Sequence, residues 1–172
     1  KTGTLTRDSM GIQAIEPAQG VPEAQALAMA AAMAVQSLHP VSRALVRAAQ
    51  EQGVPASGWT VSNLQETPGQ GLQALAQRAD GSGPVWRLRL GSSRYTGCGQ
   101  GSAGVPADAS GSVWLAYLDD GGQPHLMARF AVAEDLRAHS ASVVAALRQQ
   151  GLAVQLLSGD RSEAVARLAE RA

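Results

Sequence analysis

The sequence predicts a mixed α/β chain, because helical and strand-like patterns alternate along its 172 residues. Apolar residues recur at helical spacing over 22–52, alternate as in strands over 59–132, and return to helical spacing after 134. Hydrophobic residues make up 45% of the chain, which is enough to bury a core and argues against general disorder. At roughly 150 residues per domain, the length corresponds to one domain, or to one domain with part of another.

Two helices are expected in the first third of the chain. A proline stands at the start of each, where its fixed φ suits the first helical turn, and a run rich in Ala, Leu and Met follows the first proline. We therefore predict helices over 22–35 and 40–52, with a short strand over 11–15 before them. The first ten residues are polar and are predicted to be turn-like.

The middle of the chain is predicted to form antiparallel hairpins. Alternation of apolar and charged residues over 85–90 indicates a half-buried strand. Glycine-containing turns at 68–71 and 119–122 separate strand-like segments, and each turn therefore predicts a hairpin. The hairpin strands are expected at 59–66, 72–77, 113–118 and 126–132. The stretch 96–110 is rich in Gly, Ala and Ser and is predicted to be a mobile surface loop.

The C-terminal segment predicts one arm of a parallel α/β fold. Its pattern indicates a helix over 136–150, a strand over 152–157, a turn over 158–160 and a helix over 161–171. A parallel strand needs neighbours on both sides, and this chain supplies too few of them. We therefore expect the remainder of this sheet domain to lie beyond Ala172.

Composition and charge exclude several classes of function. Lys and Arg number 14, and so do Asp and Glu, so a net charge of zero gives no electrostatic basis for binding nucleic acid or an anionic membrane. Cys98 is the only cysteine, which excludes an internal disulfide and a multi-cysteine metal site. The longest apolar run covers only 26–35, whereas a membrane-spanning helix needs about 20 residues. The chain starts at Lys1 with neither Met nor an apolar signal segment, and we expect it to be a fragment of a longer protein.

Three short motifs could bind a phosphorylated ligand. The opening KTGTLT offers hydroxyls and backbone N–H groups to a phosphate. Pro40 keeps His39 out of the α conformation, so the imidazole stands at the start of a helix, where it could stack on a purine or hydrogen-bond to it. Pro68-Gly69-Gln70-Gly71 lacks Cβ atoms at two positions, which would let a flat ligand approach the backbone. Ordinary structure also explains each motif: a polar terminus, a loop histidine beside a helix cap, and a hairpin turn.

Taken together and in this order, the motifs resemble those of heavy-metal-transporting (copper/zinc-type) P-type ATPases. KTGTLT matches the DKTGTLT of that family without the aspartate that becomes phosphorylated, and Ser37-Leu38-His39-Pro40 matches its Ser-x-His-Pro. The Gly-x-Gly of Gly69 and Gly71 follows the His-Pro helix, as in the family. Further matches are the pocket glycine Gly91, the return segment Asp135-Leu136-Arg137, and Ser158-Gly159-Asp160 in place of Thr-Gly-Asp.

The resemblance covers nearly the whole chain and implies a fold. Residues 10–133 would form a nucleotide-binding domain, an α+β insert with an antiparallel sheet flanked by helices. Residues 1–9 would begin the phosphorylation domain, and residues 134–172 would return to it as a partial Rossmann-like domain of the haloacid-dehalogenase type.

The resemblance also implies a function, that of the ATP-binding part of a heavy-metal cation pump at the cytoplasmic face of the cell membrane. In the intact pump, ATP would phosphorylate the aspartate before Lys1 to drive metal export, with Mg²⁺ as cofactor and the transported metal bound elsewhere. Without that aspartate, these residues alone are expected to be inactive as an ATPase. The implied residues are His39, Gly69, Gly71 and Gly91 for ATP binding, Thr2, Ser158 and Asp160 for catalysis, and the Thr2 backbone carbonyl for Mg²⁺.

Two positions depart from the family pattern. The family places a glutamate five residues before the histidine, where this chain has Ala34, and an asparagine after the pocket glycine, where it has Ser92. Ala34 cannot accept a hydrogen bond from an adenine amino group. We expect weaker or less selective adenine binding, with a lost buried polar contact costing on the order of 1 kcal/mol.

Two other functions remain open. A haloacid-dehalogenase-type phosphatase with an inserted cap domain would explain KTGTLT and 158–160 but not the His-Pro and Gly-x-Gly pair, and membrane-spanning helices upstream of Lys1 would exclude it. A regulatory or scaffold module that has lost nucleotide binding is favoured by Ala34 and Ser92. An ATP affinity left unchanged by His39→Ala would support that module.

Overall fold

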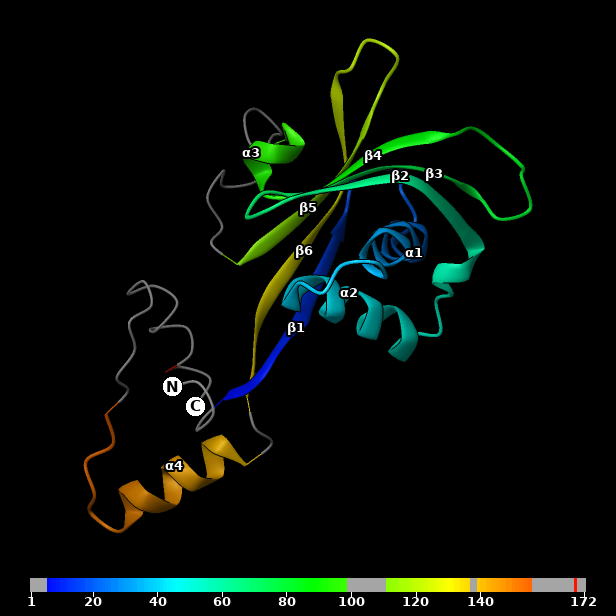
Figure 1. Ribbon diagram of the computed structural model, residues 1–172. Coiled ribbons are helices and arrows are strands. Elements are labelled where there is room, and N and C mark those ends of the chain that lie inside the picture. Colours follow the sequence, from blue (N-terminus) through cyan, green and yellow to red (C-terminus); the bar gives the residue numbers. More distant parts are fainter. Residues whose placement is uncertain (1–5, 99–110, 137–138, 156–168, 170–172) are drawn as a thin grey trace. The chain divides into compact units, whose positions relative to one another are not determined.

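The computed structural model describes residues 6–98, 111–136, 139–155 and 169. It separates into two compact units, one formed by Gly11–Ala133 and the other by Lys1–Met10 together with Glu134–Ala172. The larger unit holds most of the described helices and strands and is shown with the smaller one in Figure 1.

The larger unit is built on a six-stranded sheet with the strand order β1-β6-β5-β4-β3-β2. Each pair from β2–β3 to β5–β6 is antiparallel, as the hairpin patterns predict. The sheet order joins strands that are distant in sequence, because β1 lies beside β6. The strands are β1 (Thr6–Pro17), β2 (Trp59–Thr67), β3 (Gly71–Arg78), β4 (Trp86–Gly91), β5 (Ser112–Leu118) and β6 (Pro124–Leu136).

Two helices, α1 (Glu23–Ala34) and α2 (Pro40–Glu51), cover one face of this sheet (Figure 1). Residues 26–34 of α1 are all buried, because this helix is apolar around its whole circumference and packs between the sheet and α2. In contrast, α2 is amphipathic and buries one side. The largest fully buried side chains of the core are Phe130, Leu27, Met29, Met33, Leu45, Leu88 and Leu115.

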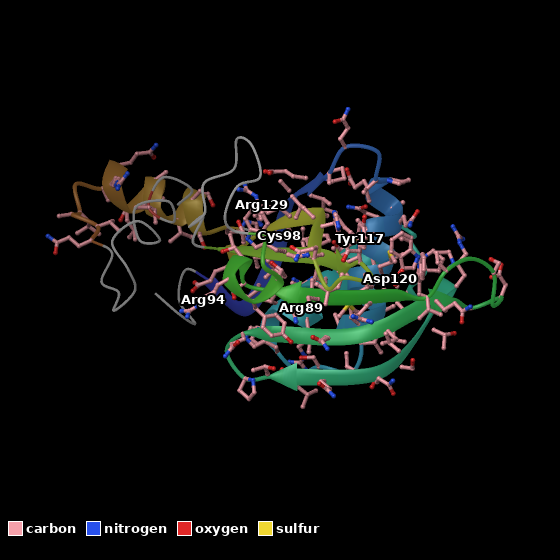
Figure 2. The ribbon with its side chains drawn as sticks, turned by 90° about the horizontal axis from the view of Figure 1, so that it is seen from above. Arg89, Arg94, Cys98, Tyr117, Asp120 and Arg129 are labelled. Atoms are coloured by element: carbon pink, nitrogen blue, oxygen red, sulfur yellow. The ribbon has the colours of Figure 1, made fainter. Side chains whose placement is uncertain are left out.

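The opposite face of the sheet carries the short helix α3 (Ser93–Thr96) and polar side chains (Figure 2). Arg89 alternates with the buried Leu88 and Leu90, and its Nε donates a hydrogen bond to Oε1 of Gln73 at 3.1 Å. The alternation predicted for 85–90 is thus confirmed, with one side of the strand in the core and the other polar.

The expected helices at 22–35 and 40–52 and the expected hairpins are confirmed, but the first strand is longer than predicted. β1 begins at Thr6, inside the segment predicted to be turn-like. The polar residues of this segment carry little strand signal of their own, and pairing with β6 supplies the hydrogen bonds. An ion pair of 2.9 Å between Arg129 Nη2 of β6 and Glu16 Oε1 of β1 links the same two strands.

The prediction of a mobile surface loop over 96–110 is wrong at its first residues. Thr96 ends α3 and is fully buried, and its hydroxyl donates to the backbone carbonyls of Ser92 and Ser93. Cys98 is also buried and packs with Trp114 and Ala116. Small side chains such as those of Thr96 and Cys98 can pack closely in a core and are also common in loops. Composition alone therefore does not distinguish the two. Residues 99–110 lie outside the described residues.

In the smaller unit, α4 covers Ser140–Gln149 instead of the predicted 136–150, because β6 continues to Leu136. Residues 152–155 are not in a strand, so the predicted strand over 152–157 is wrong in its described part. A strand needs a hydrogen-bonded neighbour, and none pairs with these residues in the described part of the chain. The predicted turn at 158–160 and most of the predicted helix at 161–171 lie outside the described residues. No helix within the described residues has the length and apolar character to cross a membrane.

Candidate functional site

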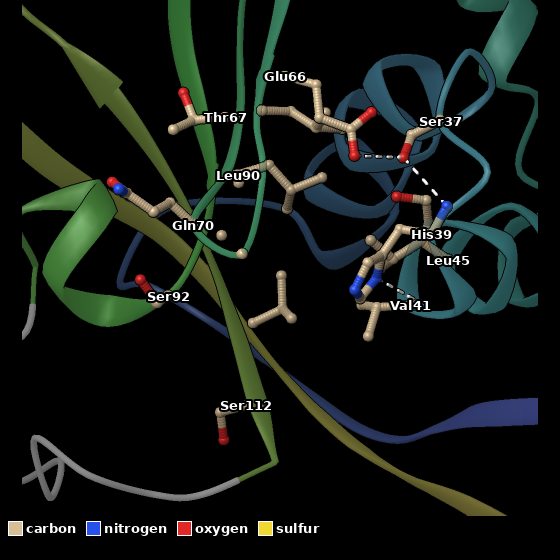
Figure 3. Close-up of a pocket in the computed structure, with 16 residues that line it drawn as sticks. Ser37, His39, Val41, Leu45, Glu66, Thr67, Gln70, Leu90, Ser92 and Ser112 are labelled. Atoms are coloured by element: carbon tan, nitrogen blue, oxygen red, sulfur yellow. Dashed lines mark hydrogen bonds between the residues drawn. The ribbon is translucent and has the colours of Figure 1, made fainter.

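A pocket opens in the larger unit between the start of α2 and the adjoining ends of β2, β3 and β4 (Figure 3). Its volume is about 230 Å³. Pockets that enclose a whole drug-sized ligand have roughly 300–1,000 Å³, so this one suits a flat part of a ligand with the remainder projecting outward. The lining residues are Ser37, His39, Val41, Ser42, Leu45, Glu66, Thr67, Gly69, Gln70, Gly71, Leu72, Leu90, Gly91, Ser92, Ser112 and Val113.

His39 stands at the N-terminus of α2 and lines the pocket. Pro40 occupies the first turn of the helix, and His39 has the extended conformation (φ −60°, ψ 138°) expected of a residue before proline. Its Nδ1 accepts a hydrogen bond from the backbone N–H of Val41 at 3.3 Å, so the ring caps the helix. With Nδ1 as acceptor, a neutral imidazole carries its hydrogen on Nε2, which leaves that N–H as a donor.

Ser37 holds the backbone of His39 and the side chain of Glu66. Its hydroxyl oxygen accepts a hydrogen bond from the His39 backbone N–H at 3.2 Å and donates one to Glu66 Oε1 at 3.3 Å. Ser37 is only 5% exposed, whereas Glu66 is exposed, so the hydroxyl anchors a surface carboxylate from a buried position. This one hydroxyl therefore connects the start of α2 with the end of β2.

The three predicted glycines also line the pocket, and the structure gives each of them a role in the fold. Gly71 and Gly91 are direct partners in the β3–β4 pairing. A Cβ on Gly71 would overlap the carbonyl oxygen of Leu90, and a Cβ on Gly91 would overlap that of Gln70. Gly69 has space around it but adopts a φ of +72°, which favours glycine.

Ser92 and Ala34, the two departures from the resemblance, have different surroundings. The Ser92 hydroxyl accepts a hydrogen bond from the Tyr95 backbone N–H at 3.3 Å and caps α3, while the residue lines the pocket. Ala34 lies in the core at the end of α1, is 1% exposed and is not among the lining residues.

Sequence reasoning missed Glu66, which contributes the single carboxylate of the lining. No Lys or Arg lies among the lining residues in the part of the chain that the structure describes, so the Glu66 carboxylate gives this pocket a negative charge. The signal that could have found Glu66 is its place near the end of a strand, two residues before Pro68 of the Pro-Gly turn. Gln70, Ser112 and Val113 also line the pocket without having been predicted.

The other predicted site residues, Thr2, Ser158 and Asp160, lie outside the described residues. Within the described ranges, no group of three or more His, Cys, Asp or Glu side chains is arranged to hold a metal ion. The structure thus brings together four of the predicted residues, His39, Gly69, Gly71 and Gly91, in one pocket.

Comparisons with known proteins give matches along the whole chain. Residues 1–172 match the family model described as haloacid dehalogenase-like hydrolase. The chain is 34% identical over 171 residues to "Probable copper-transporting ATPase SynA" of Synechococcus elongatus, covering 99% of this chain and 20% of the relative. It is 26% identical over 178 residues to "Zinc-transporting ATPase" of Bacillus subtilis, covering 100% of this chain and 26% of the relative.

Among solved structures, a zinc-transporting PIB-type ATPase aligns with a TM-score of 0.73 and 27% identity, over 99% of this chain and 26% of that one. The catalytic domain of the CPx-ATPase CopB-B aligns with a TM-score of 0.64 at 23% identity, over 99% of this chain and 56% of that one, which shows the shared fold. The chain spans about a fifth to a quarter of the length of the curated relatives.

Proposed function

The chain belongs to the haloacid dehalogenase-like hydrolase family, and we propose that it is the ATP-binding region of a heavy-metal-transporting P-type ATPase. Its homology to the catalytic region of such pumps extends over 99% of the chain and supports this proposal. Residues 10–133 would form the nucleotide-binding domain. Residues 1–9 and 134–172 would belong to the phosphorylation domain.

The observation that carries the proposal is the meeting of His39 with Gly69, Gly71 and Gly91 in one pocket. The imidazole ring offers a face for stacking and an Nε2–H donor, and the apolar side chains of Val41, Leu45 and Leu90 complete the lining. A purine is flat, apolar on its faces and polar at its edges, so its base would fit such a pocket. The sugar and the phosphates would project outward.

The phosphoryl-transfer step would take place at the aspartate that the family places before Lys1. A carboxylate oxygen of that aspartate would bond to the γ-phosphorus while the bond to the β–γ bridging oxygen breaks and ADP leaves; water would later hydrolyse the acyl phosphate. Thr2, Ser158 and Asp160 are our proposed catalytic residues for this site. A bound Mg²⁺ would neutralise phosphate charge, held in part by the Thr2 backbone carbonyl, which lies outside the described residues.

Two further parts of the proposal concern the whole pump. The transported heavy-metal cation would bind elsewhere in the longer protein, and ATP binding would take place at the cytoplasmic face of the cell membrane. The proposal is supported by relatives whose names describe copper- or zinc-transporting ATPases.

The proposal is tested by titrating ATP into the ¹⁵N-labelled 172-residue polypeptide and following the backbone amide signals. We expect the signals of His39, Gly69, Gly71 and Gly91 to shift together with one dissociation constant. We also expect no release of inorganic phosphate, because the polypeptide lacks the aspartate before Lys1. Amide signals that stay unmoved at these positions up to millimolar ATP would refute nucleotide binding in this pocket.

The role of the imidazole needs a variant that keeps the helix cap. His39→Ala removes both the ring and the hydrogen bond to Val41, and loss of a helix cap alone costs about 1 kcal/mol. His39→Asn keeps a capping side chain but removes the ring. We expect both variants to bind ATP at least about fivefold more weakly, with only the alanine variant less stable. Wild-type affinity in both variants would favour a module that does not bind nucleotide through this ring.

A further inference from the structure

We propose that Glu66 accepts a hydrogen bond from the exocyclic amino group of the bound adenine and thereby makes the pocket selective for ATP. This inference rests on the proposed function, because it assigns one residue within the proposed nucleotide pocket. The family pattern has a glutamate at the position of Ala34, and Glu66 would supply the hydrogen-bond acceptor that this chain lacks there.

The position of Glu66 at the pocket is fixed by two contacts. It is the second-last residue of β2 and is the register partner of Leu72 in β3, which also lines the pocket. Its Oε1 accepts the hydrogen bond from the buried Ser37 hydroxyl at 3.3 Å (Figure 3). Its other oxygen, Oε2, has no partner among the residues that the structure describes, so it remains available to a ligand.

Glu66 and His39 both line the pocket and carry complementary hydrogen-bonding groups. The carboxylate only accepts hydrogen bonds, and the Nε2–H of a neutral His39 donates. Adenine offers an N6 amino donor beside the N7 acceptor, whereas guanine presents two acceptors, O6 and N7, along the same edge. A pocket with one acceptor and one donor therefore matches adenine, and the Glu66 carboxylate would repel the O6 of guanine placed in the same way.

Ser37 gives this arrangement its geometry. The same hydroxyl binds the backbone of His39 and the carboxylate of Glu66, so one atom links the residue that carries the donor to the side chain that carries the acceptor. Ala34, in contrast, is buried in the core and does not line the pocket, so a ligand would find no polar group there. Ser37 would thus act as a positioning residue for Glu66, without itself reading the base.

The test compares ATP with purine riboside triphosphate, which differs from ATP only by lacking the 6-amino group. Dissociation constants are measured for the wild-type chain, Glu66→Ala and Glu66→Gln. We expect the wild type to bind ATP about five- to twentyfold more tightly than the analogue. The ratio should fall to about one in Glu66→Ala and to an intermediate value in Glu66→Gln, since glutamine keeps an uncharged acceptor. The ratio cancels any general repulsion between the Glu66 charge and the triphosphate.

Two controls separate this role from charge and from packing. Glu51→Gln removes the same charge from an exposed position on α2 and should keep the wild-type ratio. Ser37→Ala should lower the ratio without abolishing ATP binding, because the carboxylate loses its anchor but remains at the pocket. Glu66 is exposed, so its variants are expected to fold.

The outcomes distinguish the inference from the function on which it rests. A chain that binds ATP through His39 but keeps its ratio in Glu66→Ala overturns the inference alone. A wild type that prefers GTP over ATP also overturns it, because the carboxylate would then read the N1–H of guanine. Absence of any ATP binding to the wild type overturns both proposals.

Discussion

Gly71→Ala tests whether the glycines of the pocket are required by the fold. A Cβ on Gly71 would overlap the Leu90 carbonyl oxygen and would lie 2.8 Å from the Gly91 Cα and from Cδ1 of Tyr95. The Tyr95 side chain can move, but the backbone atoms cannot move without breaking the β3–β4 pairing. Forcing extra atoms into packed structure costs about 1–3 kcal/mol, and holding alanine at a φ of +156° costs about 1–3 kcal/mol more.

Gly69→Ala is the matched control, because nothing lies within 4 Å of its added Cβ. Only the φ of +72° opposes this substitution, at a cost of about 1–2 kcal/mol. The free energy of unfolding should therefore fall by about 4 kcal/mol in Gly71→Ala, clearly more than in Gly69→Ala. A native domain has about 5–15 kcal/mol in total, so the Gly71 variant should be close to unfolding.

Urea unfolding followed by tryptophan fluorescence measures both changes. All three tryptophans, Trp59, Trp86 and Trp114, lie in the sheet of the larger unit, so the signal reports on that unit. With a denaturant slope of about 2 kcal/mol/M, the midpoint of Gly71→Ala should fall by about 2 M. A Gly71 variant as stable as the Gly69 variant would refute the assignment of this glycine to the strand contact.

Two further predictions follow from the described side chains. Burial raises the pKa of the Cys98 thiol above its ordinary 9.0, so iodoacetamide should alkylate Cys98 only after urea unfolding; rapid alkylation of the native chain would contradict its burial. A hydrogen bond from His125, and then one from the Gln123 backbone, lower the pKa of Asp119 below its ordinary 3.8. A carboxyl group whose pKa is lowered by folding stabilises the fold at pH values above its unfolded-state pKa. This stabilisation is lost as the pH falls through its folded-state pKa. The free energy of unfolding at pH 6 should therefore be larger for the wild type than for Asp119→Asn, and the difference should vanish in strong acid. A difference that does not change with pH would contradict a role for the Asp119 charge in stability.

The sequence predicted the elements with strong local signals and missed those made by long-range pairing. The helices that begin at residues 23 and 40 follow from proline at the first turn and from helix-forming composition, which are local effects. The first five described residues of β1 were missed, because their strand conformation comes from pairing with β6, more than 100 residues away. Tertiary pairing of this kind leaves no periodic signal in a short polar segment.

The candidate site was predicted in part for the same reason. His39 and the three glycines stand out as motifs within short segments, and the structure brings these segments to one pocket. Glu66 belongs to no such motif, and its only sequence signal is its place near the end of a strand, because it reaches the pocket through the register of β2 with β3 and the contact with Ser37. Ala34, the position where the family pattern has a glutamate, lies in the core and is 1% exposed, which the sequence pattern alone does not indicate.

His39 and Glu66, the two side chains proposed to contact the base, each use one polar atom in the fold and leave another for a ligand. Binding experiments must therefore separate these two roles. His39 uses Nδ1 for the helix cap and keeps Nε2 for a ligand, and Glu66 uses Oε1 for Ser37 and keeps Oε2. Because the engaged group also fixes the orientation of the other, the pocket is formed before any ligand binds, which lowers the entropic cost of binding. Alanine variants remove both groups at once, so weaker ATP binding by His39→Ala combines the lost contact with the lost helix cap, and Glu66→Ala is read through the ratio of ATP to analogue affinity. Substitutions that keep a structural hydrogen-bonding group, such as His39→Asn and Glu66→Gln, separate the contribution to the fold from the contribution to binding.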